Sequence, residues 1–324
     1  MTTLKQIKEP VEAHIKSFES QFKASLKSEV GLLDKITRYI VKRKGKQIRP
    51  LYVFFSAGIF GEITERTYRA ATLIELLHTA TLIHDDVVDD SNERRGFFSL
   101  NALWKNKISV LVGDYLLSRG LLLSLDHNDF DLLQIVTESV REMSEGELMQ
   151  IEKARSLDIG EDIYLEIIRK KTASLISSCL ACGAASSGAS REEIKKMHQI
   201  GEQAGIAFQI KDDILDFDAR SAKGKPTGTD IKERKMTLPL IYLINNSSYI
   251  ERRKIINIVK SHSNDDQKVA LLISMVYEKG GIAYATKRMN AFKSEALRLL
   301  HELPESPGRH SLKQLIEFTV NRNS

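Results

Sequence analysis

Hydrophobic residues recur along this chain at intervals of three and four positions, the spacing that places side chains on one face of an α-helix. The run Leu73, Ile74 and Leu77 is one example, and Thr81 and Leu82 continue it. The alternation of polar and apolar residues that is typical of strands is scarce. The helices predicted in this way cover residues 4–27, 30–43, 48–60, 64–90, 100–106, 109–126, 129–154, 161–188, 191–218, 235–246, 249–261, 266–279, 282–303 and 310–321.

The distribution of proline supports an all-α fold. Pro50 and Pro226 are consecutive prolines, so residues 51–225 contain none, and long helices tolerate that absence best. The longest break between predicted helices is the polar segment from Asp218 to Lys235, and none of the breaks has the composition of an interdomain linker. Although a chain of 324 residues also has room for two domains, we expect one helical domain over residues 1–324.

Composition removes several classes of protein. Apolar residues make up 42% and charged residues 28%, with 6 Pro, 18 Gly and 2 Cys, which excludes disordered, collagen-like and disulfide-stabilised chains. The net charge of +5 is modest, but residues 1–50 hold 12 cations and 5 acids. Such a stretch suits nucleic acid, an anionic membrane or a phosphorylated small molecule. No signal peptide follows Met1 and no apolar run approaches the roughly 20 residues of a spanning helix, so a cytoplasmic protein is expected.

Two clusters of aspartates stand at the ends of apolar helical segments. The first contains Asp85, Asp86 and Asp89; the second, 127 residues later, contains Asp212, Asp213 and Asp216. Residues four apart share a helix face, and like charges held together there oppose one another's ionisation. A divalent cation removes that opposition, and Mg²⁺ is usually shared between one or two carboxylates and phosphate oxygens. A solvated acidic face would explain either cluster alone, but the repeated spacing favours a metal site.

Basic residues surround both clusters, as a phosphate-binding site requires. They are Lys46, Arg49, Arg94, Arg95, Lys170, Lys171, Lys225 and Lys235. Lys46 and Arg49 lie at a predicted helix start, where backbone N–H groups also favour anions. Any one of these side chains is more often solvated than a ligand, so the inference rests on their occurring together.

Taken together, these motifs resemble the trans-isoprenyl diphosphate synthases, the polyprenyl synthetase family. The two D-D-x-x-D motifs, G-K-x-x-R-P, R-R-G, K-T-A, F-Q and G-K-P-x-G-x-D occur in the family's order between about Gly45 and Pro239. The resemblance implies a single large bundle of antiparallel helices around a central cavity, with the acidic motifs facing each other across its mouth. One departure is Arg234, which replaces the glycine that the family usually has before the lysine corresponding to Lys235.

The resemblance also implies a reaction and a set of roles. The family condenses isopentenyl diphosphate with an allylic diphosphate head to tail (1'-4), through Mg²⁺-assisted ionisation, condensation and proton elimination. It implies three Mg²⁺ ions per substrate-bound site, homodimers, transient membrane contact during product release, and no nucleic-acid partner. The implied metal ligands are Asp85, Asp89 and Asp212, with Asp86, Asp213 and Asp216 in direct or water-mediated support. The implied allylic diphosphate ligands are Arg94, Lys171, Lys225 and Lys235, those for isopentenyl diphosphate are Lys46, Arg49, His78 and Arg95, and Gln209 and Thr172 would direct oxygens toward the carbocation.

Small residues below the first acidic cluster bear on the length of the product. Ala80 and Thr81 precede Asp85 by five and four residues, which puts them about 6–7.5 Å below the metals along a helix. Short-product relatives carry a bulky aromatic residue near here, whereas this chain has room down to Leu77. We therefore expect a medium-to-long product of C30 to C50, octaprenyl-like and of the kind used for quinone side chains; a short-chain synthase is the alternative.

Other functions match fewer of the motifs. His84–Asp85 fits the doublet of HD-type metal phosphohydrolases, but His14 is the only histidine before His78, and the second cluster would be unused. Glu75 and His78 form one half of a di-iron motif whose other half is missing. Terpene cyclases usually lack the second D-D-x-x-D, regulatory subunits lose both, and no nucleic-acid-binding motif is recognisable.

Overall fold

The computed structural model describes residues 3–42, 45–88, 93–94, 97–156, 160–218 and 227–322, and nearly all of them are helical. The N-terminal half contains α1 (Leu4–Lys8), η1 (Glu9–Val11), α2 (Glu12–Ser25), α3 (Gly31–Lys42), α4 (Ile48–Phe60), α5 (Glu65–Val88), β1 (Glu93–Arg94), β2 (Phe97–Phe98), α6 (Leu100–Asp126) and α7 (Phe130–Ser156). The C-terminal half contains α8 (Glu161–Ile168), η2 (Arg169–Ala173), α9 (Ser174–Ser186), α10 (Arg191–Asp216), α11 (Thr229–Lys232), α12 (Leu238–Asn245), α13 (Tyr249–Ser261), α14 (Asp266–Glu278), α15 (Gly281–His301) and α16 (Pro307–Asn321). The predicted all-α fold is confirmed.

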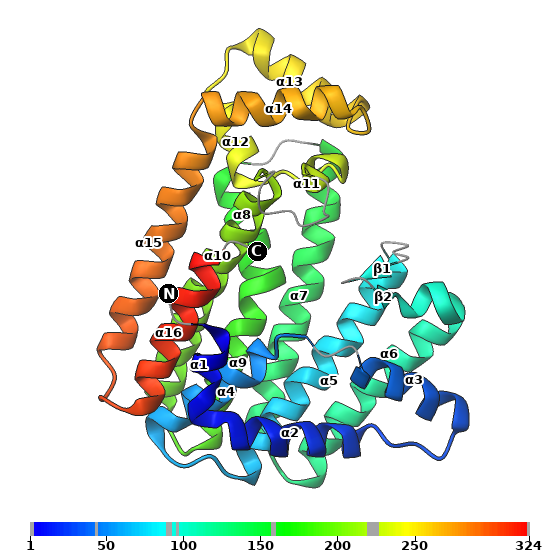
Figure 1. The fold of residues 1–324 in the computed structure, drawn as a ribbon, viewed down its shortest axis with the longest axis vertical. Helices are drawn as coiled ribbons and strands as arrows, with labels where there is room; N and C mark the ends of the chain where they lie inside the picture. Colours follow the sequence, from blue (N-terminus) through cyan, green and yellow to red (C-terminus); the bar gives the residue numbers. More distant parts are fainter. Residues whose placement is uncertain are drawn as a thin grey trace.

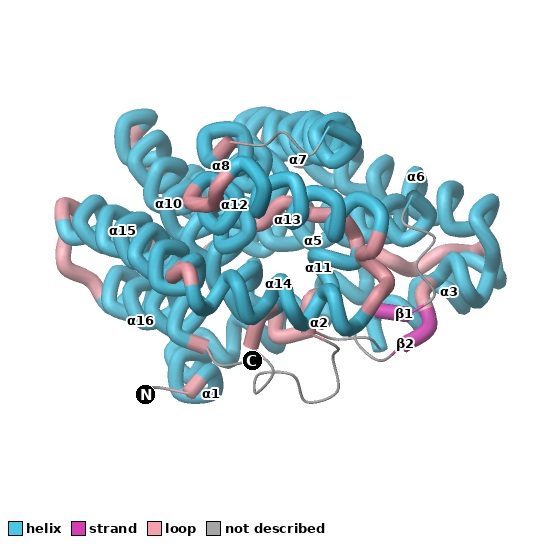
Figure 2. Tube along the Cα trace, turned by 90° about the horizontal axis from the view of Figure 1, so that it is seen from above, coloured by secondary structure: helices cyan, strands magenta, loops and turns pink. Residues whose placement is uncertain are grey.

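The longer helices stand side by side and form one bundle (Figure 1). Helix α9 lies at its centre, packed between α4 and α10, and α5 packs along α6. A continuous core of buried side chains joins α1, α2, α4, α5, α9, α10 and α16. Short helices cross the two ends: α2 lies at the bottom of the view, and α13 and α14 lie at the top. Figure 2, which looks onto that upper end, shows α12, α13 and α14 lying over the ends of the longer helices.

Local sequence explains where several helices begin. Ser190 and Glu193 form a capping box at the start of α10, and Ser248 and Glu251 form another at the start of α13. In each box the serine hydroxyl accepts from a backbone N–H that the helix leaves without a partner, and the glutamate accepts from the serine N–H. These signals are local, which is why α10 and α13 start where the sequence predicts.

Other segments differ from the predicted helices. The predicted helix 4–27 is interrupted at η1, a 3₁₀ turn that contains Pro10, because proline has no N–H to donate within a helix. The predicted helix 161–188 contains a π-helical turn, η2. Helices 100–106 and 109–126 form the single element α6, in which Lys105 has a non-helical backbone. The antiparallel pair β1–β2, which joins Glu93 to Phe98 and Arg94 to Phe97, was not predicted.

Helix α6 also modifies the expectation that no segment is long and apolar enough to cross a membrane. By length and composition alone it passes that test, with about a third of its most apolar stretch buried in the protein. Asp114 and Arg119 interrupt its apolar residues, so the search for an unbroken run missed it. The core helix of a soluble protein passes the same test.

Candidate active site

Both acidic clusters lie at the C-terminal ends of long helices. Asp85 and Asp86 belong to the last turn of α5, and Asp212, Asp213 and Asp216 to the last turns of α10. Both helices rise toward the upper half of the bundle in Figure 1. Asp86 and Asp213 are buried, with exposed fractions of 3% and 4%, whereas Asp85, Asp212 and Asp216 are partly exposed.

A chain of hydrogen bonds joins Asp213 to two predicted catalytic residues. The amide nitrogen of Gln209 donates to Asp213 Oδ1 at 2.8 Å, and the hydroxyl of Thr172 donates to the amide oxygen of Gln209 at 2.9 Å. The second oxygen of Asp213 accepts from the hydroxyl of Tyr164 at 2.7 Å. The structure thus brings Thr172, Gln209 and Asp213 together across η2 and α10, with Tyr164 of α8 completing the chain.

Burial and crowding of negative charge perturb this end of α10. Burial first, and the charge of Asp230 second, raise the pKa of Asp213 to about 7. The same two causes raise the pKa of Asp216 to about 6, and burial raises the pKa of Asp230 as well. The cluster therefore carries more acidic groups than its own surroundings stabilise as anions.

The short helix α11 is held against Asp216. The two carboxylate oxygens of Asp216 accept hydrogen bonds from the backbone N–H groups of Thr229 and Asp230, each at 3.1 Å. Asp230 also lies 3.7 Å from the ammonium of Lys235, which pairs with Glu233 at 2.5 Å. Lys235 is therefore close to the second acidic cluster, as the resemblance implies, and its charge is shared with two carboxylates.

A C-terminal arginine contacts the second acidic cluster from another side. Arg322 pairs with Asp212, and its guanidinium lies 4.4 Å from the ring centroid of Phe208. The side chain of Arg322 is mostly buried, which lowers its pKa. This arginine was not predicted, because it is 110 residues from Asp212 and has no motif around it.

The π-helical turn η2 presents Lys171 beside Thr172. Lys171 pairs with Glu147 of α7 and lies 3.4 Å from the amide oxygen of Gln150. Gly146 of α7 makes this approach possible: a Cβ at that position would lie 2.8 Å from the backbone nitrogen of Lys171 and 2.9 Å from Lys170 Cβ. Both distances are shorter than real Cβ contacts allow.

The predicted isopentenyl diphosphate ligands in the described part of the chain lie on or just before α4 and on α5. Arg49 donates from Nε to Glu75 Oε1 at 2.6 Å and from Nη2 to Glu75 Oε2 at 3.3 Å. His78 follows Glu75 by one turn of α5 and accepts at its carbonyl a hydrogen bond from Thr81. Lys46 is exposed just before α4. Glu75 therefore forms an ion pair with Arg49. This arrangement does not resemble the di-iron site whose half-motif Glu75 and His78 form in the sequence.

The residues proposed to limit chain length differ in exposure. Ala80 and Leu77 are buried: Ala80 lies in a cluster shared with α3 and α6, and Leu77 faces Gly120 of α6. Thr81 is partly exposed. Thr81 is therefore the more accessible of the two small residues below Asp85.

Some predicted residues lie outside the described part of the chain. Asp89, Arg95 and Lys225 belong to this group. For Arg94 only the backbone is described, and it forms β1 together with Glu93. The first acidic cluster is consequently represented by Asp85 and Asp86.

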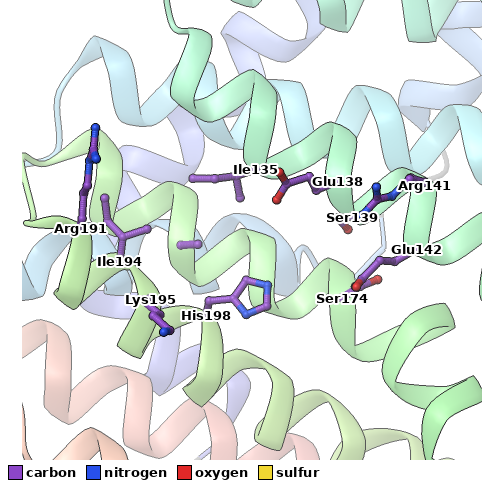
Figure 3. Close-up of a pocket in the computed structure, with 11 residues that line it drawn as sticks. Ile135, Glu138, Ser139, Arg141, Glu142, Ser174, Arg191, Ile194, Lys195 and His198 are labelled. Atoms are coloured by element: carbon purple, nitrogen blue, oxygen red, sulfur yellow. The ribbon is translucent and has the colours of Figure 1, made fainter.

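The cavity drawn in Figure 3 is separate from these residues. It has a volume of about 280 Å³ and lies among side chains of α7, α9 and α10, including Glu138, Arg141, Lys195 and His198. None of the predicted site residues lines it. Its mixture of acidic and basic side chains gives no reason to connect it with the acidic clusters.

The available ligands suit Mg²⁺ shared with a substrate rather than a closed metal cage. Within the described residues, no three His, Cys, Asp or Glu side chains converge on a metal-binding position. Instead each helix end offers carboxylate oxygens, and a cation, Arg322, already lies against Asp212. Mg²⁺ usually takes one or two carboxylates, waters and phosphate oxygens, so this ligand set fits it.

Sequence reasoning missed several residues that contact the site. Tyr164 lies in an apolar helical stretch with no local signal of its role. Asp230 is part of the G-K-P-x-G-x-D segment, so its motif was recognised while its own contact with Lys235 was not. Cys179 and Cys182 are not among the missed residues: their C-x-x-C in an apolar helical stretch predicts buried small side chains, and both are free and buried, with the pKa of each thiol raised by burial.

Comparison with known proteins places these features in context. Residues 30–276 match the sequence model of polyprenyl synthetase. The chain is 33% identical to octaprenyl diphosphate synthase of Escherichia coli over 299 residues, which cover 92% of each protein. The crystal structure of a decaprenyl diphosphate synthase from Rhodobacter capsulatus superposes with a TM-score of 0.93 at 31% identity, covering 99% of this chain and 100% of the other. A polyprenyl synthase from Caulobacter crescentus, complexed with calcium and isoprenyl diphosphate, gives 0.91 at 29% identity, with 99% and 98% covered.

Proposed function

Because this chain belongs to the polyprenyl synthetase family, we propose that it condenses isopentenyl diphosphate with an allylic diphosphate, head to tail (1'-4), and releases pyrophosphate. The product is an all-trans polyprenyl diphosphate of medium to long chain length, and the enzyme is a prenyltransferase. One observation carries the proposal: hydrogen bonds join Thr172 and Gln209 to the second acidic cluster. Two oxygen acceptors are thereby held beside the carboxylates of α10.

Each residue of the site has a part in this reaction. Mg²⁺ held by Asp85, Asp89 and Asp212, with Asp86 and Asp216 in support, would neutralise the charge that develops on the departing pyrophosphate. Lys171 and Lys235 exchange their carboxylate partners for the allylic diphosphate, joined by Arg94 and Lys225. Lys46, Arg49, His78 and Arg95 bind isopentenyl diphosphate.

The carbocation left by ionisation needs acceptors and protection from water. The oxygens of Thr172 and Gln209 are held in place before the reaction, so no reorganisation is needed when positive charge appears. Water would convert the cation to an alcohol, and the apolar side chains of the helix bundle would exclude it. No nucleophilic side chain is required.

Product length follows from the side chains below the first acidic cluster. Thr81 and Ala80 are small, and the next side chain toward the interior on this stretch of α5 is Leu77. A growing chain meets no aromatic side chain among these three. We therefore place the product between C30 and C50, with a short-chain synthase as the alternative.

Incubation with labelled isopentenyl diphosphate, farnesyl diphosphate and Mg²⁺ tests the proposal. We expect labelled prenyl diphosphates of C30 to C50 and one pyrophosphate per condensation, by mass spectrometry and a pyrophosphate assay. Asp212→Asn should lose most of this activity, whereas Asp126→Asn, which changes an exposed acid at the end of α6, should keep it. Products that stop at C15 or C20 would identify a short-chain synthase, and hydrolysis of diphosphates without chain growth would identify a phosphohydrolase.

We propose that the enzyme is a homodimer joined through α6. Val110, Leu111, Leu122 and Leu125 are exposed and lie within an arc of about 120° on that helix. An apolar face of this kind marks an interaction site in a soluble protein, and a second copy covers it without exposing new surface. Sedimentation should show a dimer, and Leu111→Glu should shift it to monomers while Leu148→Glu, an exposed leucine on α7, does not.

The α13 end of the bundle is our candidate for transient membrane contact during product release. Tyr249 and Ile250 are exposed by 74% and 80%, and Arg253, Lys254 and Lys260 on the same helix are exposed as well. Apolar and basic side chains together favour anionic lipid surfaces. The protein should sediment together with phosphatidylglycerol vesicles, and the double variant Tyr249→Ser, Ile250→Ser should stay in the supernatant.

We further propose that residues 1–324 form one domain and that it works in the cytoplasm. The C-terminal helix α16 packs against α4, and α15 packs against α10, so the C-terminal elements complete the same bundle that the N-terminal elements begin. A single cooperative unfolding transition by calorimetry is the expected result.

A further inference from the structure

We propose that Tyr164 and Asp213 are positioning residues that fix the orientation of the Gln209 side-chain amide, and through it the hydroxyl of Thr172. This inference rests on the proposed function and deepens it. It gives Asp213 a part different from the direct or water-mediated metal support that the resemblance implies. It also gives a part to Tyr164, which no motif includes.

Asp213 has its two oxygens committed within the protein. Gln209 donates to Oδ1 at 2.8 Å and Tyr164 donates to Oδ2 at 2.7 Å, and the exposed fractions of Asp213 and Tyr164 are 4% and 3%. Each oxygen keeps a second lone pair, but only 4% of Asp213 is exposed, so a metal ion and its waters could reach that lone pair only by opening the packing around it. Asp212 and Asp216 are both more exposed, so they are better placed to meet a metal.

The direction of each hydrogen bond determines which atoms of Gln209 and Thr172 remain available. An amide has a donor end and an acceptor end, whereas a carboxylate only accepts. Asp213 therefore draws the NH₂ group of Gln209 toward itself, which turns the amide oxygen toward Thr172. The Thr172 proton is donated to that oxygen at 2.9 Å, so the lone pairs of Thr172 are left for the substrate.

This orientation matters because the reacting group is cationic. With the amide as it is, both side chains present oxygen lone pairs, which attract positive charge. A reversed amide would point its NH₂ group at Thr172 and reverse the hydrogen bond between them. The positive ends of the dipoles would then lie nearer the carbocation and disfavour its formation.

Backbone packing holds the hydrogen-bonded chain together. Tyr164 lies on α8, directly before the η2 turn that carries Thr172. Gly205 of α10 lets that turn approach closely, because a Cβ there would lie 2.5 Å from Ala173 Cα. The Tyr164–Asp213 bond thus ties the segment that carries Thr172 to the helix that carries Gln209.

The orientation is tested by exchanging the acid and the amide, with Asp213→Asn first alone and then together with Gln209→Glu, which restores the net charge. In Asp213→Asn the new NH₂ group can donate to the Gln209 oxygen and reverse its amide, so we expect kcat to fall about 10- to 100-fold with KM changed by less than about threefold. The fraction of product released as prenyl alcohol should rise. Adding Gln209→Glu gives the asparagine a pure acceptor, which also accepts from Thr172, and should restore kcat to within about tenfold of the native enzyme. A double variant no faster than Asp213→Asn would overturn the inference.

A binding measurement separates this inference from the proposed metal site. Calorimetry with Mg²⁺ and inorganic pyrophosphate should give Asp213→Asn an affinity within about threefold of the native value, and Asp212→Asn a loss of about 100-fold. Equal losses in both variants would make Asp213 a metal ligand and overturn the inference. If neither variant loses affinity, the metal assignment fails instead, and the swap still decides the orientation.

Tyr164→Phe provides a variant with less risk to folding. It removes one hydroxyl and keeps the ring, so the melting temperature should fall by only a few degrees. We expect kcat to fall about three- to tenfold, with the same rise in prenyl alcohol. A purely structural role for Tyr164 predicts a lower melting temperature with native kcat and native products, which would also overturn the inference.

Discussion

Gly146 provides a direct test of how the fold positions Lys171 and Thr172. In Gly146→Ala the new Cβ would lie 2.8 Å from the backbone nitrogen of Lys171, and an ordinary contact begins at 3.4 Å. The η2 turn must therefore move away from α7 by several tenths of an ångström. Such overpacking costs about 1–3 kcal/mol, and the better helix propensity of alanine offsets about 1 kcal/mol. The net loss of unfolding free energy is about 0–2 kcal/mol.

Activity should fall by more than this small loss of stability suggests. A misplacement of about 1 Å at a reacting centre lowers rates about 100-fold, so a shift of roughly half that size predicts about a tenfold lower kcat/KM. The assay is incorporation of labelled isopentenyl diphosphate, with a thermal melt of the same sample. Gly31→Ala is the control, because a Cβ there meets nothing within 4 Å and should leave activity unchanged. Native kcat/KM in Gly146→Ala would refute the idea that this contact positions η2.

Three further predictions follow from other parts of the site. Ala80→Phe should shorten the products, and because Ala80 is buried it should also lower stability by about 1–3 kcal/mol; unchanged products would rule out a length-limiting role. Arg234→Gly should raise the free energy of unfolding by about 0.5 kcal/mol. Arg234 has φ 58°, a left-handed conformation that costs residues other than glycine about 1–2 kcal/mol, whereas glycine adopts it freely at some cost in entropy. Arg234→Ala should give no gain. The pKa values of Asp213 and Asp216 are raised from 3.8 to about 7 and about 6, so the folded protein binds these protons more tightly than the unfolded chain does. The free energy of unfolding of metal-free protein, measured with urea, should therefore fall as pH rises from about 4 to about 7, and Asp213→Asn should make that fall smaller.

Helices were predictable here because their signals are local. The bounds of α4 and α13 are those that the sequence predicts, since apolar periodicity and the capping box at Ser248 act within a few residues. The acidic clusters were found for the same reason, because a spacing of four is visible without knowing the fold. Even the unusual Arg234 was noticed as a departure, and its positive φ explains why glycine is usual there.

Pairs that depend on packing were not predictable. Tyr164 and Asp213 are 49 residues apart, Arg322 and Asp212 are 110 apart, and Arg49 and Glu75 are 26 apart. Nothing near either member of a pair identifies its partner, because the contact exists only once the helices have packed. The π-helical turn η2 likewise packs closely against α7 and α10, and no local signal in the sequence shows either contact.

The contact between Arg322 and Asp212 has a practical consequence for producing the enzyme. Any fusion added after Ser324 would begin three positions beyond Arg322, whose side chain touches the second acidic cluster. A polyhistidine tag placed there would bring metal-chelating imidazoles next to the carboxylates. Recombinant protein for kinetic work should therefore carry its purification handle ahead of Met1, or have it removed before magnesium dependence is measured.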